Sequence, residues 1–262
     1  MNATLTDIRP HEEWFRTYAA AERAKEQENP APLDLKERHT AGVLAHARAI
    51  VTEEDFPPAE ARAALLAALY HDVARFEQYR RFHTFRDAES CNHGQWGVRI
   101  LKREARLAAE TPEIRRLTLA AVGLHNRYAL PAQLPEAFRR VAWVVRDADK
   151  LDILRVMDEN LHHPDAATRT AVLSLPDTPG LYSARVLEDA LAHRVAAYAD
   201  LRSVNDFRVL LGTWLDDLHF ATSRRRFLQE RHARNLLEDL PCDAAYGLVR
   251  ARLLNRLDHS PC

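Results

Sequence analysis

Residues 63–69 form an uninterrupted run of alanine and leucine, which Tyr70, His71 and Asp72 follow directly. Both residue types favour helices, so the run predicts a helix that carries an ionisable pair on an inward face. Neighbouring side chains on a helix point roughly 100° apart, so an imidazole and a carboxylate can reach one ion from adjacent edges of that face. A buried, hydrogen-bonded His-Asp pair without an ion would use the same residues, and the dipeptide alone does not separate the two.

Helix-forming residues also dominate the rest of the chain. Of its 262 residues, 47% are hydrophobic, 29% are charged and only 7 are glycine. Alternating valine and isoleucine segments, which would indicate strands, are few. A chain of this length and composition can bury a sizeable core. The sequence therefore predicts an all-α fold.

Prolines divide the predicted helices from one another, because proline cannot continue a helix. We expect an N-terminal helix within residues 1–34 that packs on the body, a core over 35–160, and a C-terminal helical extension over 161–262 in the same globule. Later helices are expected at residues 137–154, 183–199, 207–220 and 224–240. Residues 78–92 have no clear period and predict a long irregular segment, the kind that often carries function.

The charge balance restricts the possible partners. A formal net charge of -1 gives no general attraction to duplex nucleic acid or to an anionic membrane, so an anionic ligand must be small and locally held. No signal-peptide pattern precedes His11, and no window approaches 18 apolar residues, which predicts a cytoplasmic protein. The three cysteines, Cys91, Cys242 and Cys262, lack metal-ligand spacing. The oligomeric state is left open.

Histidines fall on several separate predicted helices. His39 shares a face with apolar residues, His93 lies in the first turn of its helix, and His125 lies at the end of another. The spacings from His39 through His71 and His93 to His125 are 32, 22 and 32 residues, and Asp147 and Asp149 follow about two dozen residues later. In a helical bundle these side chains can converge on a buried pair of ions, with a donor set that suits Fe, Mn, Zn, Co or Ni.

The pattern resembles the HD-domain superfamily of metal-dependent phosphohydrolases, in which a His, a His-Asp pair and a distal Asp recur. The resemblance runs from about Leu35 to Val156 and includes His71-Asp72-Val73-Ala74-Arg75-Phe76. The sequence is similar to the subset of this superfamily with two further histidines, whose members bind two metals. It is also similar to uncharacterised bacterial HD proteins that carry the Arg-Asp-Ala-Asp-Lys-Leu-Asp segment found here at 146–152. Asn126 and the absence of a Gly-Tyr-Pro triplet depart from the cyclic-dinucleotide enzymes of that subset.

The resemblance implies an HD-domain helical bundle with additional C-terminal helices, and it implies a ligand set. Divalent transition metals, two per chain, would be the cofactor. The implied ligands are His39, His71, Asp72 and Asp149 for the first metal, with Asp72 bridging and His93 and His125 holding the second. Asp149 is preferred to Asp147 because the superfamily's distal acid lies in an Ala-Asp-x-Leu context.

Three cations are candidates for contact with a substrate phosphate. Arg75 lies one turn after His71, at a position where the relatives often carry a lysine or arginine, and it would act in catalysis together with Asp72. A salt bridge from Arg75 to Asp72 or Glu77 is an equal alternative. Arg80 and Lys150 are further candidates, although a solvated charge would also explain Arg80.

The expected function is hydrolysis of a nucleotide or another small phosphorylated metabolite, as a phosphomonoesterase or phosphodiesterase, by a metal-activated water. Two alternatives use the same ligands. One is an HD-type di-iron oxygenase that resembles the inositol oxygenase branch. The other is a non-catalytic regulatory module in which the metal serves as a scaffold.

Overall fold

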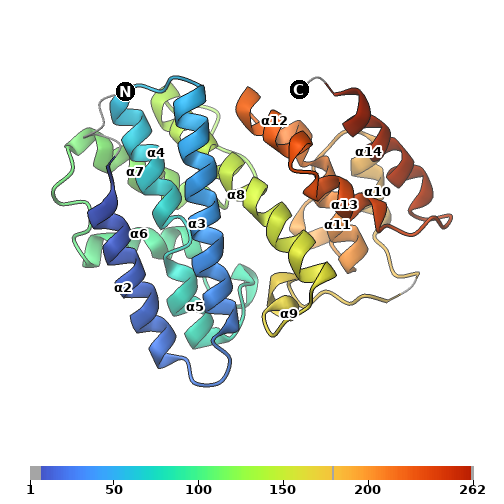
Figure 1. Ribbon diagram of the computed structural model, residues 1–262, viewed down its shortest axis with the longest axis horizontal. Coiled ribbons are helices and arrows are strands. Elements are labelled where there is room, and N and C mark those ends of the chain that lie inside the picture. Colours follow the sequence, from blue (N-terminus) through green and yellow to red (C-terminus); the bar gives the residue numbers. More distant parts are fainter. Residues whose placement is uncertain (1–6, 179, 261–262) are drawn as a thin grey trace. The chain divides into compact units, whose positions relative to one another are not determined.

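The computed structural model describes residues 7–178 and 180–260 and divides into two compact units, Met1–Asp152 and Ile153–Cys262 (Figure 1). The first residues of the predicted N-terminal segment and Cys262 lie outside the described residues. Within the described ranges the regular elements are α-helices and short 3-10 turns, without a strand, which confirms the all-α prediction. The division into 1–34, 35–160 and 161–262 stays a prediction.

Helix α4 (Pro58–Tyr70) forms the centre of the first unit. Ala61 and residues 63–70 are at most 3% exposed, so the helix is buried around its whole circumference. It packs mainly against α3 (Ala31–Glu53) and α7 (Pro112–Leu124). The predicted apolar run is therefore the core helix of this unit.

Four more helices surround this core in the first unit. They are α2 (Arg9–Lys25), α5 (Ala74–Phe82), α6 (His93–Arg103) and the first part of α8 (Glu136–His162). Helix α2 lies within the segment predicted to hold the N-terminal helix, and it packs on α3, α4 and α5. Its Phe15 and Tyr18 rings meet the Phe76 ring of α5 edge to face, at centroid distances of 5.7 and 6.1 Å.

The structure corrects two expectations about the first unit. Helix α4 ends at Tyr70, so His71 and Asp72 lie in the turn between α4 and α5 and not on a helix. The irregular segment is also shorter than expected, because α5 continues to Phe82 and leaves only residues 83–92. Packing of Phe76 and Tyr79 into the core, both under 5% exposed, stabilises this helix despite its weak periodicity.

The second unit consists of shorter helices than the sequence predicts. They are the end of α8, which runs eight residues past the expected Leu154, followed by α9 (Thr168–Ala171), α10 (Ala184–Leu191), α11 (Val204–Gly212), α12 (Ala221–Gln229), α13 (His232–Glu238) and α14 (Gly247–His259). The helix expected over 224–240 is broken between α12 and α13, where Arg231 has a left-handed φ of 63°. None of the helices in the described ranges combines the length and the apolar character that crossing a membrane requires.

A single buried carboxylate connects several helices of the second unit. Asp206 is fully buried and forms a capping box with Ser203 at the start of α11. Its oxygens also accept hydrogen bonds from the backbone N–H of Ser183, which caps α10, at 3.1 Å, and from the Tyr246 hydroxyl at 3.0 Å. The Asp206 carboxylate thus accepts hydrogen bonds from residues at the starts of three helices, α10, α11 and α14.

Substitution Asp206→Asn is expected to lower the free energy of unfolding by about 3 kcal/mol, because an amide cannot accept all of these bonds and leaves buried donors unpaired. Urea denaturation followed by circular dichroism measures the change. The exposed Asp177 provides the matched control, and Asp177→Asn should change stability by less than about 0.5 kcal/mol. Equal stability of the two variants would contradict this role of Asp206.

Candidate metal centre

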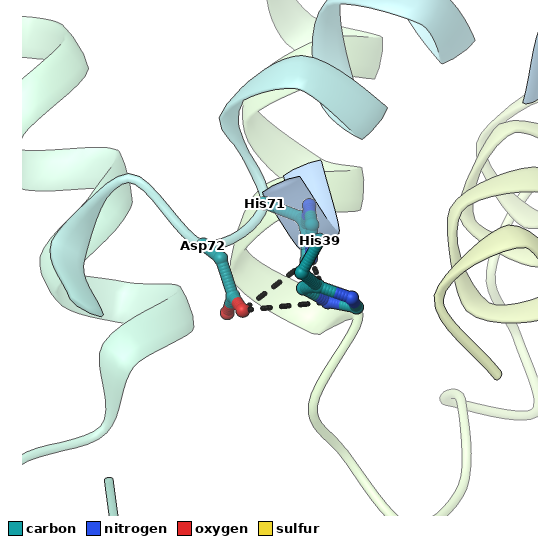
Figure 2. Close-up of side chains that lie close together, drawn as sticks. All are labelled: His39, His71 and Asp72. Atoms are coloured by element: carbon teal, nitrogen blue, oxygen red, sulfur yellow. Dashed lines mark hydrogen bonds and ion pairs between the residues drawn. The ribbon is translucent and has the colours of Figure 1, made fainter. Parts of the chain in front are cut away.

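The six predicted ligands come together in the first unit. His39, His71 and Asp72 form one group whose ligand atoms all lie within 4.8 Å of one another, and Asp72, His93 and His125 form a second such group. Figure 2 shows His71 and Asp72 on the turn after α4, pointing toward His39 of α3.

Asp149 joins the first of these groups from α8. Its Oδ1 lies 3.0 Å from His39 Nε2 and 3.6 Å from His71 Nε2. The side chain of Asp149 is 21% exposed, whereas those of His39 and His71 are at most 2% exposed. Asp149 therefore lies on the side of the centre that solvent reaches.

Asp72 lies between the two groups and turns one oxygen to each. Its Oδ2 is 3.7 Å from His39 Nε2 and 3.5 Å from His71 Nε2. Its Oδ1 is 3.5 Å from His93 Nε2 and 3.9 Å from His125 Nε2. The carboxylate is thus placed to bridge two positions.

Two of the imidazoles are oriented by the ends of their own helices. His71 is the C-cap of α4 and His125 is the C-cap of α7. Each Nδ1 lies 2.8 Å from the carbonyl oxygen three residues earlier, Ala68 for His71 and Val122 for His125. Carbonyl groups at a helix C-terminus lack intrahelical donors, so the ring satisfies one of them and is held in place by it.

The other two imidazoles are oriented by carboxylates. His39 Nδ1 lies 2.7 Å from Asp152 Oδ2, and His93 Nδ1 lies 2.7 Å from Asp87 Oδ2. Asp87, in the segment between α5 and α6, also accepts a bond from Asn126 Nδ2 at 3.0 Å. Such carboxylate partners fix the orientation of a metal-binding histidine and raise its basicity.

These bonds determine which ring nitrogens face the centre. A carbonyl or an ionised carboxylate only accepts, so each Nδ1 carries a proton, and the neutral rings of His71, His93 and His125 point an Nε2 lone pair inward. His39 Nε2 instead lies 3.0 Å from Asp149 Oδ1, to which it donates, and 3.4 Å from His71 Nε2. The Nε2 atoms of His93 and His125 are 3.0 Å apart, and because two facing lone pairs cannot bond to each other, a cation bound by both would relieve their repulsion. The residues therefore fit a metal with nitrogen and oxygen ligands.

Burial keeps three of the imidazoles in the form that binds metals. It lowers the pKa of His71, of His93 and, together with the neighbouring histidines, of His125, which falls to about 3. His39 is the exception. Burial and Lys36 act to lower its pKa, but hydrogen bonds to Asp149 and Asp152 outweigh them and raise it.

The carboxylates of the centre are ionised. Burial alone would raise the pKa of Asp72, but Lys36, His71 and Arg75 hold it well below its ordinary value. The hydrogen bond from His39 likewise outweighs burial and lowers the pKa of Asp149. Asp87 and Asp152, which bond to His93 and His39, bring two further carboxylates to the centre. Buried carboxylates are costly unless positive charge balances them.

The three predicted phosphate contacts occupy different surroundings. Arg75 lies beside Asp72, with its Nε 3.3 Å from Oδ1. Arg80 pairs with Glu22 of α2 at 2.9 Å, and Lys150 is only 8% exposed. Arg75 thus contacts a residue of the centre, whereas Arg80 pairs with a different helix.

Sequence reasoning assigned no role at the centre to Lys36, Asp87 or Asp152. Lys36 Nζ lies 2.6 Å from Asp72 Oδ2. Helical spacing carried a signal for two of them, because Lys36 precedes His39 by three residues and Asp152 follows Asp149 by three. Asp87 lies in an irregular segment, where no periodicity indicates which way a side chain points.

Gly42 makes room for the partner of His39. A Cβ at Gly42 would overlap the Asp152 carboxylate, whose Cγ would be only 2.5 Å away. Gly42→Ala is therefore expected to displace Asp152 and to weaken binding of Zn²⁺ or Co²⁺ by roughly 10- to 100-fold, the usual effect of losing an outer contact of a metal site. Competition with a chromophoric chelator measures the affinity.

Gly123→Ala in α7 is the matched control, since its Cβ would meet only the end of the Val98 side chain at 3.3 Å. It should bind metal as the wild type does. Equal metal affinity of the two glycine variants would show that Asp152 does not hold His39 in a binding orientation.

Comparison with known proteins gives one match. Residues 37–154 match the family model described as HD domain. No match was found among curated proteins or among solved structures. The matched range contains all six residues of the centre together with Asp87 and Asp152. Residues 37–154, somewhat less than half of the chain, are therefore similar to the HD domain, an all-α fold typically found in metal-dependent hydrolases.

Proposed function

We propose that this protein is a metal-dependent phosphohydrolase that acts on a nucleotide or another small phosphoester. The observation that carries the proposal is the position of Asp72, which turns one oxygen to each of two groups of inward-facing Nε2 atoms. In this proposal His39, His71 and Asp149 hold one divalent transition metal, His93 and His125 hold a second, and Asp72 is shared. Ions such as Fe, Mn, Co, Ni or Zn suit these donors.

Metals held in this way supply a nucleophile at neutral pH by lowering the pKa of water, and they offset charge that develops on phosphoryl oxygens. The chain contributes orientation and exclusion of water. The Nδ1 hydrogen bonds of the four imidazoles hold the rings in position before substrate binds. The side chains of Asp72 and the four histidines are at most 6% exposed, which limits the access of water. Preorganised charge in a closed site acts more strongly than it does in water.

The distribution of charge supports a small phosphorylated substrate. Lys36 and Arg75 are the cations that contact Asp72, so a phosphoryl group at the centre would meet positive charge there. The chain as a whole carries a net charge of -1, which favours a small ligand held by local contacts over a polyanion bound along a surface. A small phosphorylated metabolite or nucleotide fits both conditions.

Substitution Asp72→Asn is expected to reduce hydrolysis by at least roughly 100-fold, because it removes a contact to both metal positions and even outer contacts of metal sites are worth 10- to 100-fold. The assay uses Mn²⁺-, Co²⁺- or Ni²⁺-loaded protein with an aryl phosphate and a bis-aryl phosphate, which separate monoesterase from diesterase activity. A panel of nucleotides and phosphorylated metabolites follows.

Asp55→Asn serves as the control, since Asp55 is exposed and asparagine tolerates its left-handed φ of 48°. It should retain wild-type activity. A metal-loaded wild type that hydrolyses nothing in the panel, or an Asp72→Asn variant as active as the control, would rule out the proposed function.

A further inference from the structure

Lys36 occupies a position that the ligand pattern does not explain. It lies on α3 one turn before His39, and its Nζ is 2.6 Å from Asp72 Oδ2. That oxygen is the one that faces His39 and His71. The ammonium group therefore lies at the edge of the first group of ligands.

Arg75, the cation expected from the sequence to bind phosphate, has most of its donors engaged elsewhere. Its Nη1 lies 2.7 Å from Gln78 Oε1, 2.6 Å from the Phe85 carbonyl oxygen and 3.0 Å from Asp87 Oδ1, and its Nε faces Asp72. These bonds connect α5 to the segment between α5 and α6. Arg75 is thus held in place through Nε and Nη1, and a phosphate would have to compete with these acceptors for every donor except those of Nη2.

Lys36 is better suited to meet a ligand. An ammonium group has three donors, and the contact with Asp72 uses one of them. Its side chain is 15% exposed, which together with the 21% of Asp149 places both at the open side of the centre. The Phe85 ring lies 5.2 Å from Lys36 Nζ and 5.5 Å from Arg75 Cζ. This buried aromatic face directs the lysine toward the centre, because cations are attracted to it.

We propose that Lys36 is the residue that binds a phosphoryl oxygen of the substrate, and that Arg75 is a positioning residue that holds Asp87 and, through it, His93. This inference deepens the proposed function and rests on it. A metal that takes Asp72 Oδ2 would relieve Lys36 of its present partner, leaving its donors available to a phosphate beside the metals. The recognised chemistry is a phosphoryl dianion or monoanion.

The test compares Lys36→Gln, Lys36→Arg and Lys102→Gln in the full-length, Co²⁺-loaded protein. Lys102 is an exposed residue of α6, so its substitution changes the net charge equally without touching the centre. Orthophosphate affinity is measured by isothermal titration calorimetry, metal content by elemental analysis, and KM and kcat with an aryl phosphate. Glutamine is a good helix former, so α3 should remain intact.

Lys36→Gln is expected to weaken orthophosphate binding and raise KM by roughly 10- to 100-fold, the usual value of a hydrogen bond to a charged group, with unchanged metal content. Lys36→Arg should recover most of the affinity, and Lys102→Gln should match the wild type. Arg75→Gln should instead reduce metal retention or thermal stability.

Wild-type orthophosphate affinity in Lys36→Gln would overturn the inference even if the protein hydrolyses phosphoesters. A change confined to metal affinity would also overturn it, because Lys36 would then only substitute for a metal. If the loaded wild type hydrolyses no phosphoester and yet its orthophosphate affinity depends on Lys36, the proposed hydrolysis fails and the phosphate site stands.

Discussion

The first unit depends on the burial of one carboxylate among histidines. Asp72 is 3% exposed, lies within 4 Å of four imidazole Nε2 atoms, and has only Lys36 and Arg75 as cationic partners in the described structure. An ionised group at this depth is tolerated only where it is paired. The fold therefore has a demand for positive charge beside Asp72, which Lys36 and Arg75 supply and to which metal ions, if bound as proposed, would contribute.

Helix ends provide much of the geometry that meets this demand. His71 and His125 cap α4 and α7, and His93 is the first residue of α6, so three of the proposed ligands lie where the backbone changes direction. Each capping ring uses Nδ1 to satisfy a carbonyl that the helix itself leaves without a donor. The hydrogen bonds that satisfy the last carbonyl groups of α4 and α7 thus also fix the direction of each Nε2. One bond therefore serves both the stability of the helix end and the geometry of the site.

Composition and apolar periodicity were sufficient for the helical fold, because they are local signals. Histidine spacing alone left Asp147 and Asp149 open, and the six residues of the centre were collected through the resemblance to the HD pattern. The prediction that His71 and Asp72 lie on a helix was wrong, because the alanine-leucine run gives no indication of where the helix ends. Asp87 and the engagement of Arg75 by the Phe85 carbonyl depend on the path of an irregular segment, which no period determines. The shorter helices of the second unit likewise reflect tertiary contacts such as those of Asp206 and not helix propensity.

The central claim is that the two groups around Asp72 are two metal positions. Elemental analysis of protein purified from metal-supplemented cells and freed of loosely bound ions tests it most directly, with His125→Gln measured alongside. The account predicts two divalent transition metals per chain in the wild type and about one in the variant. One ion in both proteins would show that His93 and His125 do not hold a metal, and no bound ion in the wild type would contradict the account altogether.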